Sequence, residues 1–234
     1  MTRLFLSCAV LLALVAPAAA DDQTKQATEP EARKLSTHNL KQLALAAHNF
    51  HDTNNRMPPW AIHGKDGKPL LSWRVAVLPY LGKDAEELYK QFKLDEPWDS
   101  DHNKKLIEKM PRVFKHPRAG DKPGLTRYQG FVGSGMALDP DPRVRVSLAG
   151  TFKDGTSNTL LYAEAAEAVE WTKPADMTYD AKKPLPKLYD GWKDKGCVTA
   201  FADGYVRFIK AATAEETLRA LITPSGGEVV QLDD

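Results

Sequence analysis

The chain has 234 residues, with 32 lysines and arginines against 31 aspartates and glutamates and a formal net charge of +1. This balance excludes a general nucleic-acid-binding protein, because such proteins carry a basic excess. Hydrophobic residues make up 42% of the chain and aromatic residues 9%. That composition excludes a disordered, collagenous or low-complexity chain and is enough for one sizeable core or two small ones.

Residues 1–20 have the pattern of a secretory signal peptide. Arg3 supplies the positive start, residues 4–15 are apolar, and a run of alanines ends at Ala20. The apolar run is shorter than a membrane-spanning helix requires. We therefore expect cleavage after Ala20 and a secreted or periplasmic protein without stable membrane insertion; an uncleaved N-terminal anchor helix is the alternative. Cleavage would leave Cys197 as the single cysteine.

Residues 21–33 are polar and lack large apolar side chains, which is typical of a flexible tether. The first predicted helix runs from Leu35 to His51, because apolar residues recur there at spacings of three and four and form one stripe. We assign residues 34–234 to a single domain that begins with this helix.

Three further helices are predicted in the first half of the chain. The first covers residues 70–81 with Ser72 as a candidate N-cap, the second covers residues 85–92, and the third covers residues 102–110. Residues 113–114 lie between prolines and are predicted to be extended.

Glycine turns and short β-prone segments dominate the second half. Residues 144–148 alternate between apolar and polar side chains, and residues 159–163 are β-prone, so both are predicted strands. Residues 173–195 contain several prolines and many charges. A loop of this length is uncommon unless it is functional or mobile.

The strongest hairpin pattern consists of residues 198–202 and 205–209, which flank an Asp-Gly pair. Asp-Gly suits the two positive-φ positions of a type I′ turn. Asp203 and Gly204 are therefore predicted to form a structural turn.

The C-terminal part contains one more predicted helix and one more predicted strand. Residues 213–216 form a capping-box pattern that opens a helix to Ile222, and residues 228–232 are predicted to be a short strand. Because helices come first and antiparallel strands later, the sequence predicts the α+β fold class.

Several short motifs follow one another in a fixed order: His38–Leu43, His48–Asn49, Pro58–Pro59, Ser72–Val75, Leu78–Leu81, Asp154–Thr159, Glu164–Glu167 and Ala202–Phe208. Together they resemble a bacterial pilin-like family of unknown function that is also labelled solute-binding-like. The resemblance covers about Leu35 to Val230. It implies a head related to type IV pilins and pseudopilins, in which an N-terminal helix packs on an antiparallel sheet, with additional short helices and long loops.

The N-terminus departs from that family, whose members begin with a prepilin cleavage site and a long apolar helix. Here a secretory signal and a polar tether stand in their place. Because pilus-type assembly uses the apolar helix, we do not expect filament assembly. Lys193 stands where the family often has histidine and His116 where it often has cysteine, so no role of those family residues is transferred.

The segment from Asp154 to Asn158 is rich in oxygen-bearing side chains, which are the ligands that calcium prefers. Asp154, Ser157 and Asn158 are therefore candidate calcium ligands, and no other cofactor is predicted. The alternative is a turn in which these side chains bond to their own backbone.

Glu164 and Glu167 are a candidate pair for acid–base chemistry or for binding. Their carboxylates would share a face only if the surrounding alanine-rich segment were helical. The alternative is a solvated acidic edge.

Four aromatic residues border the proline-rich loop and are candidates for an aromatic binding rim: Trp171, Tyr179, Tyr189 and Trp192. Burial in the core is the alternative for some of them.

No catalytic signature is found among the motifs for nucleophile elbows, zinc proteases, phosphate loops or dinucleotide binding. The sequence therefore predicts an exported, non-catalytic interaction module that contacts a protein or a surface polymer through residues 173–195. The alternatives are an extracytoplasmic solute-binding protein and a hydrolase of unrecognised type. A two-lobed solute receptor does not fit, because the chain lacks βαβ alternation.

Overall fold

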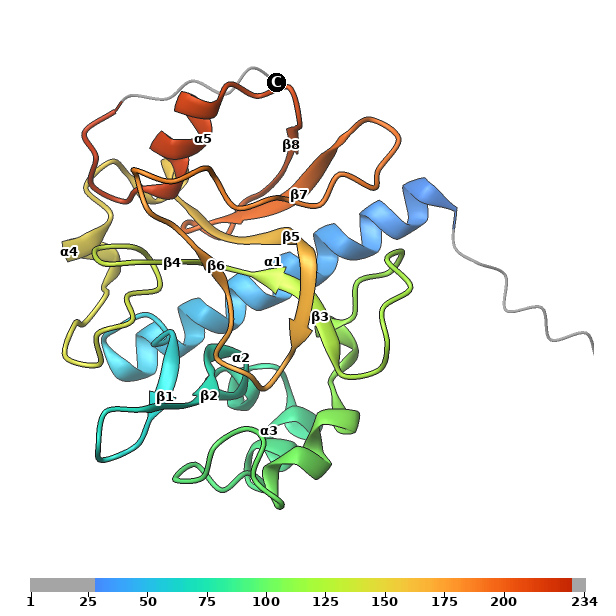
Figure 1. The fold of residues 1–234 in the computed structure, drawn as a ribbon, viewed down its shortest axis with the longest axis vertical. Coiled ribbons are helices and arrows are strands. Elements are labelled where there is room, and N and C mark those ends of the chain that lie inside the picture. Colours follow the sequence, from blue (N-terminus) through green and yellow to red (C-terminus); the bar gives the residue numbers. More distant parts are fainter. Residues whose placement is uncertain (1–27, 229–234) are drawn as a thin grey trace, which may run out of the picture.

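A computed structural model describes residues 28–228 of the chain (Figure 1). The expected signal peptide at residues 1–20, the first part of the expected tether, and all but the first residue of the strand expected at 228–232 lie outside the described residues. Helices make up 32% of the structure and strands 20%, which confirms the predicted α+β fold class.

The elements follow one another along the chain without internal repeats. The helices are α1 (Glu29–Asn54), α2 (Trp73–Ala76), α3 (Lys83–Tyr89), α4 (Leu148–Thr151) and α5 (Glu215–Ile222), with the 3₁₀ turns η1 (Leu78–Tyr80), η2 (Asn103–Lys109), η3 (Arg112–Phe114) and η4 (Thr156–Asn158). The strands are β1 (Ala61–His63), β2 (Pro69–Ser72), β3 (Leu125–Gln129), β4 (Phe131–Val132), β5 (Leu160–Glu170), β6 (Met177–Thr178), β7 (Gly196–Phe201) and β8 (Val206–Lys210).

Helix α1 is longer than predicted at both ends. It begins at Glu29 because the Glu31 carboxylate accepts hydrogen bonds of 2.8 Å from both the backbone N–H and the hydroxyl of Thr28. The expected tether therefore does not extend to Arg33, since residues 29–33 are helical. The helix ends at Asn54, and Asn55 closes it in the left-handed conformation with a φ of 53°.

Ser72 caps a helix as predicted, since its hydroxyl accepts a hydrogen bond of 3.2 Å from the Arg74 N–H. The single helix expected over residues 70–81 is wrong, because this segment contains the end of β2, then α2 and then η1. Pro79 has no N–H to continue an α-helix, and a 3₁₀ turn takes its place.

Other predicted elements also differ from the structure. The helix expected at residues 102–110 is the 3₁₀ turn η2, and residues 113–114, expected to be extended, belong to η3. The strand expected at residues 144–148 is irregular until α4 begins at Leu148. In that segment the carbonyl of Val146 accepts a hydrogen bond from Met57, but no neighbouring strand in the described residues forms a ladder with it.

The main sheet is antiparallel, with strand order β3-β5-β7-β8. Two small sheets lie beside it: β1 pairs antiparallel with β2, and β4 pairs parallel with β6. In Figure 1, α1 runs diagonally past the main sheet and α5 lies near β7 and β8. No helix within residues 28–228 combines the length and the apolar character needed to cross a membrane.

Two apolar clusters cover the two faces of the main sheet. Alternate residues of β7, such as Val198 and Ala200, join the larger cluster with α1. Phe201 points to the other face and joins the smaller cluster, which includes residues 221–222 of α5. In the larger cluster Trp73 stacks on Tyr162 with ring centroids 4.0 Å apart.

Glu164 is fully buried in β5, at the point where the pairing of β5 with β7 ends. The last pair joins Ala163 with Thr199. The next amide of β7, that of Val198, donates to the Glu164 carboxylate at 2.7 Å instead of to the β5 backbone. The side chain therefore replaces the missing rung of the sheet.

The same carboxylate joins three further segments. Ser36 of α1 donates through its hydroxyl, His116 Nε2 lies 3.0 Å from Oε1, and Trp192 Nε1 donates to Oε2 at 2.8 Å. The Nδ1 atom of His116 accepts from the amides of residues 118 and 119, so Nε2 carries the proton and donates. The buried charge is thus surrounded by donors, as its burial requires.

Glu167 does not share this environment. It is exposed on the same strand, three residues further on, and residues at that spacing in a strand face opposite sides of the sheet. The acid–base pair expected from Glu164 and Glu167 is therefore not formed. The strand itself continues to Glu170, beyond the predicted end at Ala163.

The predicted hairpin is confirmed, but its turn type is wrong. Gly204 has a φ of 84°, whereas Asp203 keeps a negative φ, and a type I′ turn needs positive φ at both. The Gly204 N–H donates to the Phe201 carbonyl at 2.9 Å, and the Tyr205 N–H donates to the Asp203 carboxylate at 2.8 Å. This is the three-residue loop in which a left-handed glycine forms a bulge.

Helix α5 is confirmed, but the capping box expected at residues 213–216 is wrong. The helix begins at Glu215, so the N-cap residue is Ala214, which has no side-chain acceptor. Thr213 lies one residue too early to cap the helix.

Gly204→Ala should destabilise the protein by about 1–2 kcal/mol, because a β-carbon is strained at positive φ. The added atom itself would lie 3.8 Å from His48, an ordinary contact. Gly204→Asn should cost less than Gly204→Ala, since asparagine tolerates the left-handed region. Urea denaturation of the three proteins measures this order, and equal costs for both variants would contradict it.

Glu164→Ala should reduce the free energy of unfolding by about 3–5 kcal/mol, because it leaves buried donors without an acceptor. Glu167→Ala is the matched control on the same strand and should stay within about 0.5 kcal/mol of the wild type. Urea denaturation compares them. Similar small losses for the two variants would show that the Glu164 contacts contribute little.

Candidate functional site

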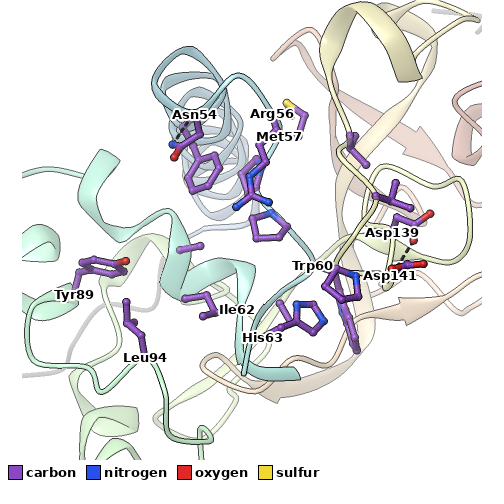
Figure 2. A pocket seen from close by; sticks show the side chains of 18 residues that line it. Asn54, Arg56, Met57, Trp60, Ile62, His63, Tyr89, Leu94, Asp139 and Asp141 are labelled. Atoms are coloured by element: carbon purple, nitrogen blue, oxygen red, sulfur yellow. Dashed lines mark hydrogen bonds between the residues drawn. The ribbon is translucent and has the colours of Figure 1, made fainter. Parts of the chain in front are cut away.

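A pocket of about 410 Å³ lies at the C-terminal end of α1 (Figure 2). Its walls come from the end of α1 and the chain that follows it, from β1, from the segment around α3, and from residues 139–146. These segments belong to the ordered framework of the fold, and the volume falls in the range of small-molecule sites.

Aromatic and apolar side chains form much of the wall. Trp60 and His63 lie on either side of the start of β1, with ring centroids 6.3 Å apart and tilted by 57°. Figure 2 shows Tyr89 and Leu94 together on another side of the pocket, and Ile62 between them and His63. The pocket therefore offers ring faces and aliphatic groups to a bound molecule.

The two carboxylates of the pocket are already engaged by donors. Asp139 is buried, and its two oxygens accept from the amides of Gly135 at 2.7 Å and Asp141 at 2.9 Å. Arg143 donates to Asp141 through its guanidinium and its backbone N–H. These contacts lower the pKa of Asp141 to about 2, so its charge is present at neutral pH and matched by Arg143.

Arg56 differs from these groups. It follows α1 and lines the pocket, half-buried, with no hydrogen-bond or ion-pair partner for its guanidinium within residues 28–228. In Figure 2 it lies apart from Asp139 and Asp141. Its guanidinium is thus the charge of the pocket that remains available to a ligand.

Two further polar groups flank this charge. The Trp60 Nε1 atom is buried and has no partner among the described residues, which is uncommon for an indole donor. Burial lowers the pKa of His63, although nearby carbonyls and Asp141 partly oppose the shift. The imidazole is therefore neutral at neutral pH.

The aromatic residues predicted to form a binding rim do not lie together on the surface. Trp171 is fully buried, stacks on Phe114 at 5.5 Å and donates to the carbonyl of Ile107 at 2.9 Å. Trp192 is 1% exposed and bonds to Glu164. Both tryptophans are core residues, which is the alternative stated for them.

The two tyrosines of that group are half-buried and lie apart. Tyr179 lies under Arg219 of α5, 5.9 Å from its guanidinium carbon. Tyr189 packs against His116 with ring centroids 4.5 Å apart.

The segment 173–195 is anchored rather than free. It contains β6, and its Asp176 forms an ion pair of 2.8 Å with Arg74 in which both side chains are fully buried. Burial raises the pKa of Asp176, and the guanidinium opposes that shift. Arg74 also donates to the carbonyl of Tyr128, so the segment is tied to the core.

The candidate calcium ligands form a closed turn. The Asp154 carboxylate accepts from the amides of Gly226 at 2.7 Å and Gly227 at 3.0 Å. Asn158 donates its side-chain amide to the Asp154 carbonyl at 2.9 Å, and Ser157 is exposed. Between residues 28 and 228 no three His, Cys, Asp or Glu side chains gather as a metal site would require. The geometry matches the alternative of a self-bonded turn.

The pocket residues were not among the predicted site residues. Arg56, Trp60 and His63 stand close together after the first helix, around the Pro58–Pro59 motif, and this cluster of an arginine, a tryptophan and a histidine beside prolines is the signal that the sequence contains. Asp139 and Asp141 come from a distant segment, and only the fold brings them to the same pocket.

Residues 26–125 match the family SBP_bac_10, described as a protein of unknown function (DUF1559). No curated protein and no solved structure matches the chain. The match spans α1, β1, β2 and α3, and with them Arg56, Trp60 and His63. It does not test the pilin-like relation, which stays a prediction. Over residues 26–125, the resemblance to this family of unknown function, with its solute-binding-like label, is confirmed.

Proposed function

We propose that this protein is an exported, non-catalytic binding protein that holds a small anionic solute in the pocket at the end of α1. The observation that carries the proposal is the Arg56 guanidinium, which lines an enclosed pocket without a partner in the described residues. A guanidinium in such a place favours a carboxylate or a similar anion, which it binds through two parallel hydrogen bonds.

The rest of the pocket supports a solute with an apolar or ring-shaped body. Trp60, His63 and Tyr89 present aromatic surface, and such surface combined with a few polar groups is typical of small-molecule sites. Asp139 and Asp141 do not oppose the anion strongly, because backbone amides and Arg143 already engage them.

A binding role fits the chemistry of the pocket better than catalysis. Its donors, Arg56 and neutral His63, can fix a ligand, whereas the two carboxylates are occupied as acceptors. A general base must reach the proton that it removes, and these carboxylates are committed to other donors. The proposal of export rests on the signal-peptide pattern of residues 1–20.

Contact with a protein or a surface polymer through residues 173–195 stays a prediction. The core positions of Trp171 and Trp192 weaken its basis, because these side chains were the main candidates for contact. We therefore locate the binding role in the pocket and not in that segment.

Arg56→Ala should weaken binding of the anionic solute about 10- to 100-fold, since a hydrogen bond to a charged group contributes about 1.5–3 kcal/mol. The chain from Asp21 onward would first be screened by thermal shift against small carboxylates, sugar acids and amino acids. Calorimetry with the best ligand then compares wild type and variant.

Arg112→Ala is the matched control, because Arg112 is exposed and does not line the pocket; it should bind like the wild type. The uncharged amide of the same ligand should bind the wild type about as weakly as Arg56→Ala binds the acid. If no anion of the panel binds, or if Arg56→Ala binds it unchanged, the proposed function is wrong.

A further inference from the structure

A second cavity, of about 310 Å³, lies on the face of the main sheet that is turned away from α1. It is bounded by β7, β8, α5 and residues 185–190. None of its lining residues belongs to the pocket at the end of α1. It is therefore a separate site, and nothing in the proposed function depends on it.

The cavity exists because β7 separates from β5 at Glu164. Beyond that point the segment 187–189 takes the place of β7 beside β5: Ala166 donates to the carbonyl of Lys187 at 3.0 Å, and Tyr189 donates to the carbonyl of Glu164 at 2.8 Å. The walls on both sides of the gap are thus hydrogen-bonded to the sheet. The cavity is a built feature of the fold and not a space beneath a free loop.

The interior of the cavity is apolar. Its lining includes Phe131, Leu160, Leu188, Ile209 and Leu218. Cys197 also lines it, 1% exposed, and burial raises the pKa of its thiol well above the ordinary value. The thiol is therefore protonated at neutral pH and behaves as an apolar group. Such an interior favours a hydrocarbon chain over a polar ligand.

The rim of the cavity is positively charged. Lys187 and Lys210 line it, both are exposed, and neither forms an ion pair within residues 28–228. Asp190 is the single carboxylate among the described lining residues. The rim thus carries two cationic side chains against one anionic side chain, which complements one negative head group.

We infer that this cavity binds a free single-chain amphiphile that ends in a carboxylate, with the chain between the sheet and α5 and the head group at Lys187 and Lys210. The apolar interior accounts for the chain, and the unpaired lysines account for the head. Both features are needed, since an apolar interior alone would accept an alcohol or an alkane equally well.

Calorimetry on the chain from Asp21 onward, with hexanoate, octanoate and decanoate as probes, tests this inference. Each added methylene should tighten binding about fourfold, as expected for burial of a hydrocarbon chain. Decanol should bind at least tenfold more weakly than decanoate. Affinity that does not depend on chain length, or equal binding of decanol, would overturn the inference.

The double variant Lys187→Glu/Lys210→Glu should weaken decanoate binding at least tenfold and leave decanol binding unchanged. Lys182→Glu is the matched control, because Lys182 is exposed on the same segment but does not line the cavity. Loss of decanoate binding in Arg56→Ala would place the ligand in the other pocket and contradict the inference, whereas Arg56→Ala that fails to bind small solutes but still binds decanoate separates the two sites.

Cys197 gives a second measurement that does not depend on the lysine variants. In the chain from Asp21 onward it is the single thiol, and it lines the cavity. Decanoate should slow its modification by a thiol reagent at least tenfold, while acetate should not. Equal rates with and without decanoate would show that the chain does not enter the cavity.

Discussion

A carboxylate can leave water only when hydrogen-bond donors take the place of its hydration, and the donors around Glu164 come from segments that lie far apart in the sequence. Ser36 belongs to α1, His116 precedes β3, Trp192 precedes β7, and the Val198 amide belongs to β7 itself. Burying this charge therefore fixes the helix, the sheet and the segment 173–195 relative to one another. The position of the sheet on α1 depends on this one side chain.

The same carboxylate explains where the molecule has space. By ending the pairing of β5 with β7, Glu164 allows the segment 187–189 to enter beside β5, and the second cavity lies in the resulting gap. The first pocket lies at the far end of α1, where the chain turns back after Asn55. Both cavities border hydrogen-bonded elements, so a ligand would find them largely preformed and would meet a small cost of ordering.

Local pattern was enough to predict α1, the β7–β8 hairpin and the Ser72 cap, because the stripe, the Asp-Gly pair and the hydroxyl act over a few residues. It failed where distant contacts decide. The segment around Glu164 is rich in alanine and glutamate and suits a helix, yet pairing with β3 and β7 makes it a strand. The pocket was missed for the same reason, since Asp139 meets Arg56 and Trp60 only in the folded chain.

A double-mutant cycle on the free energy of unfolding tests most directly whether the Glu164 contacts act as one unit. Glu164→Gln and His116→Gln would be made singly and together, and each protein unfolded in urea. If the carboxylate holds these segments together, the two changes should couple by about 1–3 kcal/mol, because each single variant already breaks the shared contact. Additive losses, equal within about 0.5 kcal/mol, would show that His116 and Glu164 stabilise the fold independently and would contradict this account.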